Sequence, residues 1–128
     1  MIFGIGIDLI EIERIKAELE KHGDRFCKMV FTEKEIEYCR RNKNLNIQAQ
    51  CFSGRFAAKE AFFKAIGIGL QNGLGWKDVE VMKDKLGKPN IALKNKSLRL
   101  IKDEKISNIH LSISHSKHYA TAFVILEK

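Results

Sequence analysis

Apolar residues recur along this chain with two periods, about 2 and about 3.6 residues, and the two periods separate expected strands from expected helices. The N-terminal segment is apolar and rich in isoleucine, which predicts a buried strand over residues 2–7. Four later segments alternate apolar and polar side chains or carry β-branched residues, and they are expected to be strands: 76–83, 90–93, 109–114 and 119–126.

Helical spacing identifies four segments between these strands. Isoleucine and leucine recur three or four residues apart after residue 9, and Gly23 offers a stop signal for this first helix. Thr32 followed by Glu35 is a typical start signal for a second helix. The expected helices, the third of which Gly67 ends, are 9–19, 32–41, 47–66 and 97–105.

The order of the elements is strand, helices, hairpin, helix and hairpin. Such an order favours an α+β fold with an antiparallel sheet over repeated strand–helix–strand units. The longest element is one central helix, 47–66. Because the chain has 128 residues and no repeat, linker or low-complexity tract, we expect a single domain, 1–128.

Composition is typical of a soluble globular protein, because 45% of the residues are hydrophobic and 30% are charged. No apolar run approaches the length of a membrane span, and residues 1–8 lack the features of an export signal. We therefore expect a cytoplasmic location and no membrane partner. Cys27, Cys39 and Cys51 form no closely spaced pair, so reduced thiols are expected rather than a zinc site.

The net charge of +7 favours polyanionic partners, which include nucleic acids, phosphorylated ligands and acidic proteins. The alternative is that the positive charge serves solubility alone and implies no polyanionic partner. A module that binds nucleic acid needs exposed aromatic residues beside its cations for base stacking. The aromatic residues of this chain fall mostly in the apolar helix and the strands, which counts against nucleic acid as a partner.

The central helix carries charged residues in an otherwise apolar stretch. Because residues four apart share a helix face, Phe56, Glu60 and Lys64 form one stripe. Arg55 and Lys59 form the neighbouring stripe. A glutamate in a largely buried helix needs a partner, and the three cations are candidates for neutralising phosphate oxygens.

Asp8 is the second candidate carboxylate. One interpretation makes it the N-cap of the first helix, with Glu11 completing a capping box. The other notes that Asp8 ends the first strand, where its side chain can point into a crevice. Together, Asp8 and Glu60 suit Mg²⁺, an ion that takes oxygen ligands and commonly uses one or two carboxylates plus substrate phosphates.

Two glycine-rich segments are poor phosphate or dinucleotide sites. The segment 67–75 follows a helix, whereas a phosphate loop precedes one. Gly4 and Gly6 lack the third glycine of the dinucleotide fingerprint. Among the histidines, His115 stands out in a turn after a strand, as an exposed side chain or as a group for phosphate binding or proton transfer.

With these motifs in order, the chain resembles the holo-[acyl-carrier-protein] synthase family of small bacterial 4′-phosphopantetheinyl transferases. The resemblance spans nearly the whole chain. Four pieces match in order: Gly6-Ile-Asp8 with Glu11-x-x-Arg14, Arg55-Phe-Ala-Ala-Lys-Glu60-Ala with Lys64-Ala-x-Gly67, Gly87-Lys88-Pro89, and Ser112-x-Ser114-His115-Ser116. The second piece, in the central helix, is the most specific of them.

The resemblance implies transfer of the 4′-phosphopantetheine arm of coenzyme A to a serine of an apo-acyl carrier protein, a step of fatty acid biosynthesis. It implies Mg²⁺ held by Asp8 and Glu60, and catalytic roles for Glu60, Lys64 and His115. Whether Glu60 or a water molecule beside the metal takes the serine proton stays open. Six residues are implied to bind coenzyme A: Arg55, Lys64, Gly67, Pro89, His115 and Ser116.

The resemblance also implies a homotrimer with each site between two subunits, and a basic face of the first helix for the acidic carrier. That face contains Arg14, Lys21 and Arg25, although Glu18 dilutes its charge. The basic segment 40–43 is either a further phosphate contact or a solvated connector. A coenzyme A-binding protein without catalysis is the remaining alternative, but it would not need the two carboxylates.

Overall fold

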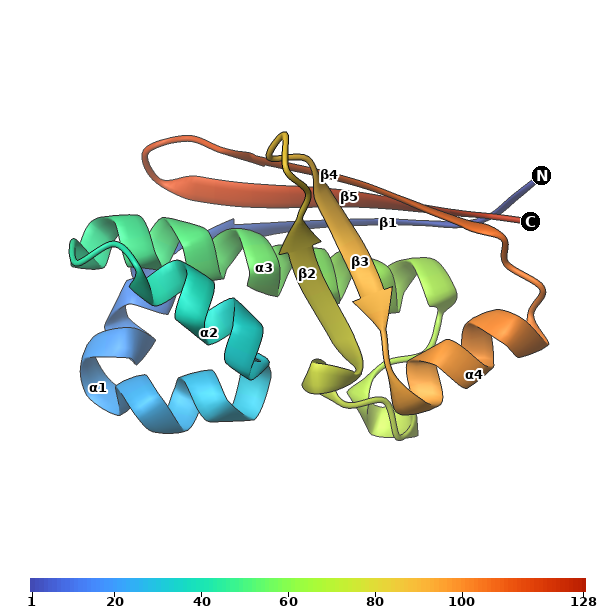
Figure 1. The fold of residues 1–128 in the computed structure, drawn as a ribbon, viewed down its shortest axis with the longest axis horizontal. Coiled ribbons are helices and arrows are strands. Elements are labelled where there is room, and N and C mark those ends of the chain that lie inside the picture. Colours follow the sequence, from blue (N-terminus) through green and yellow to red (C-terminus); the bar gives the residue numbers. More distant parts are fainter.

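The computed structural model describes all residues, 1–128, as a sheet and a hairpin built around one long helix (Figure 1). The larger sheet is antiparallel, with the strand order β1-β5-β4. A separate antiparallel hairpin pairs β2 with β3. The five strands are β1 (Ile2–Glu11), β2 (Val79–Lys83), β3 (Pro89–Leu93), β4 (Asn108–His115) and β5 (Tyr119–Glu127). The predicted α+β class with antiparallel pairing is confirmed.

Four helices complete the fold, and the longest one is central, as predicted. They are α1 (Ile12–Val30), α2 (Glu33–Arg40), α3 (Leu45–Ile66) and α4 (Asn95–Asp103), with short 3₁₀ turns at Leu70–Asn72 and Trp76–Asp78. The second of these turns occupies the start of the segment that was expected to be a strand. Gly67 ends α3 with φ of 82°, a left-handed conformation that glycine adopts readily. None of the helices is long and apolar enough to cross a membrane.

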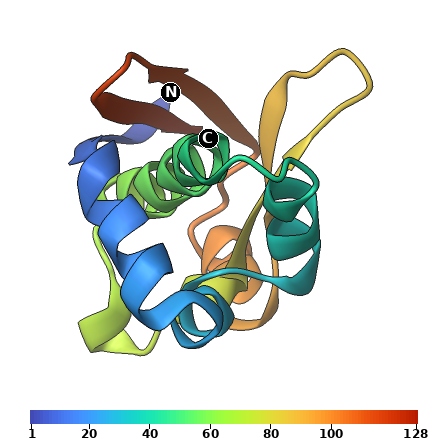
Figure 2. The same ribbon diagram turned by 90° about the vertical axis from the view of Figure 1, so that its left-hand side faces the viewer.

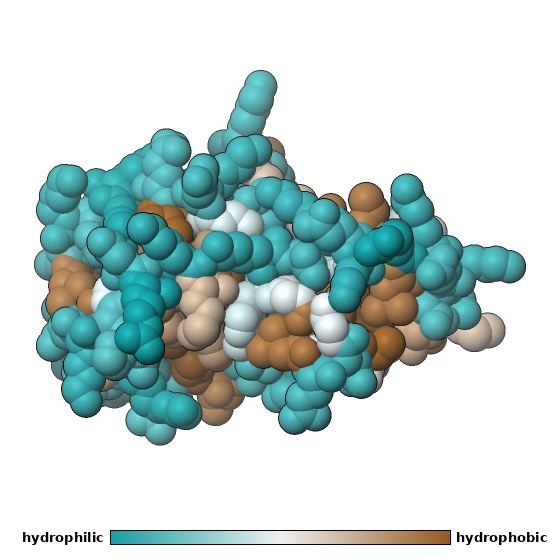
Figure 3. Space-filling view, turned by 90° about the horizontal axis from the view of Figure 1, so that it is seen from below, coloured by the Kyte–Doolittle hydropathy of each residue, from teal (hydrophilic) through white to brown (hydrophobic).

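The three-stranded sheet packs on α3 with one face only, as Figure 1 shows along the upper side of the molecule. Alternate residues of β5 are buried against α3: Ala120, Ala122, Val124 and Leu126. The opposite face of the sheet has no cover within the chain. Figure 3 views the molecule from below, on the side away from this sheet, where hydrophilic side chains dominate and apolar patches lie between them.

Gly4 and Gly6 allow β1 to lie directly against α3. A β-carbon at Gly6 would lie 1.8 Å from the carbonyl oxygen of Ala61, and one at Gly4 would lie 1.9 Å from that of Ala65. Both distances are impossible for a real side chain. The Gly-x-Gly segment therefore serves strand–helix packing, and this packing sets Asp8 beside the Glu60 turn of α3.

The N-terminal strand is longer than predicted, so the N-cap interpretation of Asp8 is wrong. Asp8 lies inside β1 opposite Ala122, and pairing with β5 continues to Glu11. Glu11 is the N-cap residue of α1, although its side chain makes no cap hydrogen bond. Backbone pairing along β5 overrides the helical spacing of residues 9–11, because local periodicity carries no information on the neighbouring strand.

The predicted end of the first helix at Gly23 is also wrong. The backbone kinks at His22, with φ of −131° and ψ of 25°, and the helix then resumes as far as Val30. The second half buries Phe26, Cys27 and Val30 in the core. Burial of these side chains outweighs the weak helix propensity of one glycine.

A buried ion pair joins α2 to α3. The ammonium of Lys59 donates to Glu35 Oε1 at 2.7 Å, and both side chains are fully buried. It also donates to the carbonyl oxygens of Val30 and Trp76, at 2.9 and 3.0 Å. Since all three donors of Lys59 are occupied, its assignment as a phosphate partner is wrong.

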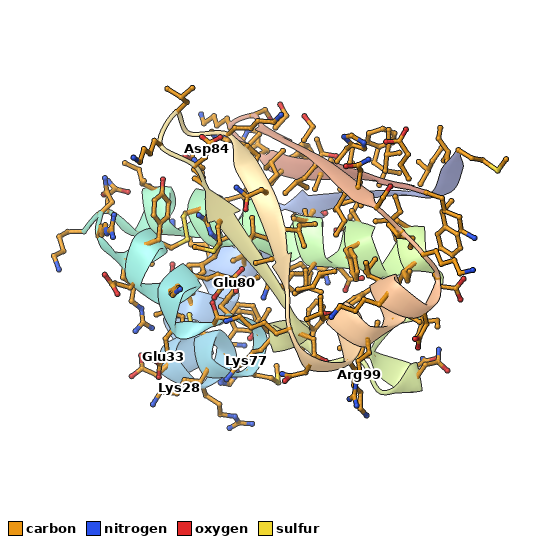
Figure 4. All side chains as sticks on the ribbon, turned by 45° about the vertical axis from the view of Figure 1, so that its right-hand side comes forward. Lys28, Glu33, Lys77, Glu80, Asp84 and Arg99 are labelled. Atoms are coloured by element: carbon orange, nitrogen blue, oxygen red, sulfur yellow. A yellow bond between two sulfur atoms is a disulfide. The ribbon has the colours of Figure 1, made fainter.

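Glu80 extends this polar core toward α4. The Thr32 hydroxyl donates to Glu80 Oε2, and the ammonium of Lys94 lies 3.4 Å from the same oxygen. Burial alone would raise the pKa of Glu80, but the Thr32 hydrogen bond and the Lys94 charge together hold it below its ordinary value. Figure 4 labels Glu80 on β2. The predicted capping signal at Thr32 and Glu35 is confirmed as a full capping box at the start of α2.

Two of the three cysteines form a disulfide, which contradicts the expectation of reduced thiols. Cys39 near the end of α2 is bonded to Cys51 in the second turn of α3, across a sequence separation of 12 residues. The chain reverses between the two helices and brings the sulfur atoms together, a proximity that sequence spacing does not reveal. Cys27 remains a free thiol in the core.

Candidate active site

The first candidate site is a cavity between β1, α1 and α3, which we call the carboxylate pocket. Its volume is about 620 Å³. It brings together four of the predicted site residues: Asp8, Arg14, Glu60 and Lys64. Strand β1 supplies Asp8, and the backbone carbonyl of Asp8 accepts a hydrogen bond of 2.7 Å from the Thr121 hydroxyl of β5. The walls add apolar side chains, among them Phe26, Met29 and Phe56.

Lys64 links the two elements that carry the carboxylates. Its ammonium donates to Asp8 Oδ1 at 3.2 Å and to the carbonyl oxygen of Ile7 at 2.9 Å. The side chain of Lys64 is 55% exposed, whereas that of Asp8 is 17% exposed. The ammonium can therefore leave Asp8 for a ligand without a large desolvation cost.

Glu60 lies one helical turn before Lys64. Burial raises the pKa of its carboxyl group, the negative charge of Asp8 raises it further, and Lys64 opposes both effects. Phe56, one turn before Glu60, lines the same pocket, and its ring lies 5.0 Å from that of Trp76. A second cation in this pocket would relieve the repulsion between the two carboxylates.

The donor set fits a magnesium ion that shares its coordination with a substrate. No cluster of three or more His, Cys, Asp or Glu side chains exists anywhere in the chain to hold a metal alone. Two carboxylates are the protein ligands that Mg²⁺ commonly uses when phosphate oxygens and water supply the rest. The pocket therefore suits a metal that binds together with a phosphorylated ligand.

The second candidate site lies between α2, α3 and the β2–β3 hairpin, and we call it the arginine pocket. Its volume is about 410 Å³. Three of the predicted coenzyme-binding residues line it: Arg55, Pro89 and His115. Figure 2 shows the hairpin that carries Pro89 projecting beyond the helices. This hairpin turns at Gly87, whose φ of 86° favours glycine.

Arg55 is a buried cation without a carboxylate partner. Only 4% of the residue is exposed, and its Nε has no hydrogen-bond partner. Its Nη1 donates to Cys51 Sγ at 3.1 Å, and its guanidinium carbon lies 4.5 Å from the centre of the Tyr38 ring. Burial lowers the pKa of Arg55, while the charge of Glu35 opposes the shift. A buried guanidinium with a free donor is suited to binding an anion.

The two pockets open on different sides of α3. Arg55 and Glu60 are five residues apart, which separates them by about 140° around the helix axis and about 7.5 Å along it. No residue lines both pockets. A ligand that needs both sets of side chains cannot therefore find them in a single opening of one copy of the chain.

The remaining predicted site residues lie outside both pockets. Gly67 caps α3, and the Ser116 hydroxyl accepts a 3.3 Å hydrogen bond from the Tyr119 N–H within the β4–β5 turn. Lys21 and Arg25 are exposed on either side of the α1 kink. A further cleft of about 490 Å³ between the start of α1 and the β4–β5 turn contains none of the predicted site residues.

Several lining residues were missed from the sequence. Tyr38, Cys51 and Lys83 line the arginine pocket, and Phe26 and Met29 line the carboxylate pocket. Only tertiary packing brings Tyr38 and Lys83 beside Arg55, so no local pattern marks them. The helical phase of Phe26 and Met29 could have been found if α1 had been extended past Gly23.

Comparisons with known proteins find related chains over nearly the whole length of this one. The family model described as the 4′-phosphopantetheinyl transferase superfamily matches residues 4–124. The holo-[acyl-carrier-protein] synthase of Clostridium tetani is 50% identical over 127 residues, which cover 99% of this chain and 97% of the relative. That of Halothermothrix orenii is 45% identical over 128 residues, which cover 100% and 99%.

A solved structure gives the same result for the fold. The holo-(acyl-carrier-protein) synthase of Bacillus anthracis, in complex with CoA (3′,5′-ADP), is 39% identical and has a TM-score of 0.81. The match covers 99% of this chain and 97% of that one. The fold expected from the resemblance is therefore confirmed.

Proposed function

The chain belongs to the 4′-phosphopantetheinyl transferase superfamily, and from this premise we propose that it is a holo-[acyl-carrier-protein] synthase. It transfers the 4′-phosphopantetheine arm of coenzyme A to a serine of an apo-acyl carrier protein and releases adenosine 3′,5′-bisphosphate. The observation that carries this function in the structure is the pairing of Asp8 and Glu60 beside Lys64 in one pocket.

The reaction needs positioning and charge neutralisation more than an enzyme nucleophile. The serine oxygen attacks the phosphorus that carries pantetheine, and the bond from this phosphorus to the bridging oxygen breaks. The bridging oxygen leaves with adenosine 3′,5′-bisphosphate, and the serine proton passes to a base. Lys64 is exposed enough to turn from Asp8 to a pyrophosphate oxygen, where its charge stabilises the transition state.

Asp8 and Glu60 are the residues that would hold Mg²⁺ in this scheme. When bound, the ion supplies Lewis-acid stabilisation of the phosphoryl oxygens. The raised pKa of Glu60 and its cause, burial together with the charge of Asp8, support a cation at this point.

The arginine pocket takes the nucleotide end of coenzyme A in this proposal. Arg55, Lys83 and His115 line the cavity and are the groups that would neutralise a phosphate there. Pro89 and Ile113 give it apolar surface for the adenine ring. Gly67 and Ser116, which the resemblance also implicates, line neither pocket.

A homotrimer with each site between two subunits would unite the pockets. Support comes from the uncovered face of the three-stranded sheet, which carries large apolar side chains: Ile5, Ile7, Leu9, Tyr119 and Phe123. Ile7, opposite Phe123 in the neighbouring strand, is 58% exposed, and Leu9 is 65% exposed. An apolar sheet face of this kind is a candidate for association between copies.

The acyl carrier protein docks on α1 in this scheme. Arg14 lies at the rim of the carboxylate pocket, and Lys21 and Arg25 continue along the helix surface. Their charges, with the net charge of +7, favour an acidic partner. Glu18 lines the same pocket and weakens this basic face. A cytoplasmic location, where carrier and coenzyme A would meet, completes the proposal.

Mass spectrometry of a carrier protein tests the proposed function. Incubation of an apo-acyl carrier protein with coenzyme A, Mg²⁺ and the enzyme should add one phosphopantetheine group to the carrier. The same mixture with a chelator in place of Mg²⁺ should leave the carrier unmodified. Unchanged mass with several apo carriers in the presence of Mg²⁺ would refute the function.

A further inference from the structure

The disulfide between Cys39 and Cys51 forms part of the wall of the arginine pocket. Cys39 is buried behind the wall, whereas Cys51 is partly exposed and lines the cavity. A small thiol can therefore reach Cys51 Sγ through the pocket, with Cys39 as the leaving thiolate. The bond is placed for exchange with solution rather than sealed in the core.

Both bonded cysteines are tied to Arg55. Cys51 Sγ accepts the 3.1 Å hydrogen bond from Arg55 Nη1, and the carbonyl oxygen of Cys51 lies 3.4 Å from the same nitrogen. Cys39 follows Tyr38, whose ring lies under the Arg55 guanidinium. The disulfide thus fixes the end of α2, and with it Tyr38, against the turn of α3 that presents Arg55.

From this geometry we infer that Cys39 and Cys51 form a reversible thiol–disulfide site that sets the affinity of the arginine pocket for the nucleotide phosphate. The inference rests on the proposed function of this pocket. Cytosolic disulfides, where they occur, are usually transient and redox-sensing rather than structural. A reversible site therefore agrees better with the proposed cytoplasmic location than a permanent crosslink does.

Low-molecular-weight thiols and their disulfides act as the reductant and the oxidant of the cysteine pair. Oxidation joins the two sulfur atoms, removes both thiol protons and transfers two electrons to a low-molecular-weight disulfide, which is released as two thiol molecules. Reduction by a dithiol reverses the step, returns a proton to each cysteine and leaves the dithiol as a cyclic disulfide. No other reactant is needed.

The oxidised form should bind the phosphate more tightly for two reasons. A disulfide sulfur is neutral, so the charge of Arg55 remains available to an anion. After reduction, an adjacent arginine favours the thiolate of Cys51, and this thiolate competes with phosphate for the guanidinium. Reduction also releases Tyr38 from its fixed position. We expect a loss of roughly tenfold in affinity, the size of one charge-assisted hydrogen bond.

Binding of adenosine 3′,5′-bisphosphate to the two redox forms tests the inference. This ligand has no thiol, so, unlike coenzyme A, it cannot reduce the disulfide during the measurement. The full-length protein is oxidised with glutathione disulfide or reduced with dithiothreitol, and both forms are titrated by calorimetry. Alkylation of the denatured protein should count one thiol in the oxidised form and three in the reduced form, in agreement with free Cys27.

Thermodynamic linkage supplies a second readout from the same samples. If the oxidised form binds tenfold more tightly, saturating ligand must favour oxidation by the same factor. The midpoint potential of the cysteine pair should then fall by about 30 mV when adenosine 3′,5′-bisphosphate is present. This shift is measured in wild-type protein and does not depend on a variant that folds.

Variants separate the pair from the third cysteine. Cys39→Ser keeps the Cys51 thiol and should bind with the weaker affinity. Cys51→Ser should lose less affinity, because it also removes the competing thiolate, and neither variant can form the intramolecular disulfide. Cys27→Ser should respond to oxidant like the wild type. Equal affinity of the two wild-type forms, or three alkylated thiols after oxidation, would overturn the inference alone. Absence of binding by both forms would overturn the proposed function of the pocket and the inference with it.

Discussion

Glu60 is the residue on which the proposed chemistry depends most. It lies on the same side of α3 as Phe56 and Lys64, and its carboxyl group shares the pocket with Asp8. Two negative charges in a partly apolar cavity are unfavourable without a cation, as the direction of the pKa shift of Glu60 indicates. Such repulsion between the carboxylates of Asp8 and Glu60 is expected at a site that binds a metal and a phosphorylated ligand.

Replacement of Glu60 should separate catalysis from stability. We predict that Glu60→Gln lowers kcat by about 100-fold or more, because it removes a charge that holds the cation against the transition state. The melting temperature without metal should stay equal to that of the wild type or rise, since the variant relieves repulsion with Asp8. Mg²⁺ and coenzyme A should raise the melting temperature of the wild type more than that of the variant.

Glu18→Gln is the matched control, because it removes the same charge from the lining of the same pocket. It should retain near-normal kcat. Near-normal turnover by Glu60→Gln would return Glu60 to a structural role.

Sequence reasoning at the residue scale could not distinguish side chains that face a cavity from side chains that turn inward. Lys64 and Lys59 look equivalent in the sequence, yet Lys64 reaches Asp8 while Lys59 lies in the core with Glu35. The difference arises because Lys59 lies on the side of α3 that faces α2, and the sequence of α3 alone does not show which side that is. The cysteine pair was missed for the same reason.

The β1–α3 contact is the element-scale feature that sets the carboxylate pocket. Gly6 lies against the carbonyl of Ala61, one residue after Glu60, and Asp8 follows two residues later on the strand. A shift of the strand away from the helix would move the two carboxylates apart. Packing and catalysis are therefore coupled through this glycine.

Gly6→Ala should destabilise the fold and weaken the site together. The added methyl group overlaps the Ala61 carbonyl, so α3 and β1 must separate. We predict a loss of about 3 kcal/mol or more in the free energy of unfolding. That loss corresponds to a fall of roughly 10 °C in melting temperature, measured by calorimetry. Gly23→Ala, where the added β-carbon meets nothing within 4 Å, is the control and should not lose stability in this way.

The polar core around Glu80 makes an element-scale prediction about pH. Because the pKa of Glu80 is held below its ordinary value of 4.5, its ionised form stabilises the fold above that pH. This stabilisation is lost as the pH falls through the lowered pKa. Glu80→Gln should therefore be less stable than the wild type at pH 7, and the difference should shrink toward pH 3.

Denaturant titrations at several pH values measure this difference. Lys94→Met removes one of the two partners of Glu80 and should show a smaller effect of the same sign. A constant gap between wild type and Glu80→Gln from pH 7 to pH 3 would contradict the assignment.

At the scale of the whole molecule, the class, the element order and the long central helix could be predicted from periodicity and turn residues. The C-terminal end of α3 was predicted correctly because Gly67 is a strong stop signal, whereas the helix begins at Leu45, two residues before the predicted start. The extent of β1 and the length of α1 were predicted wrongly. Pairing with β5 determines where β1 ends, and burial of side chains in the core determines where α1 ends. The angular separation of Arg55 from Glu60 follows from their spacing on a helix, but the two distinct pockets into which they open needed the structure.

That separation leads to the central claim about the whole molecule. One copy of the chain presents a carboxylate pocket and an arginine pocket on different sides of α3. The uncovered apolar sheet face offers the surface on which copies would associate. The claim is that a working site combines the carboxylate pocket of one copy with the arginine pocket of another.

Complementation between two inactive variants tests this claim most directly. Glu60→Gln disables the carboxylate pocket, and Arg55→Met disables the arginine pocket while it keeps an apolar stem beside Tyr38. Each variant alone should be nearly inactive in the carrier-modification assay. Coexpressed at equal levels, they should recover roughly a quarter of the wild-type activity, since random assembly pairs two intact pockets at about one interface in four. Activity of the coexpressed mixture no higher than that of the separate variants, with trimers verified by native mass spectrometry, would contradict the account.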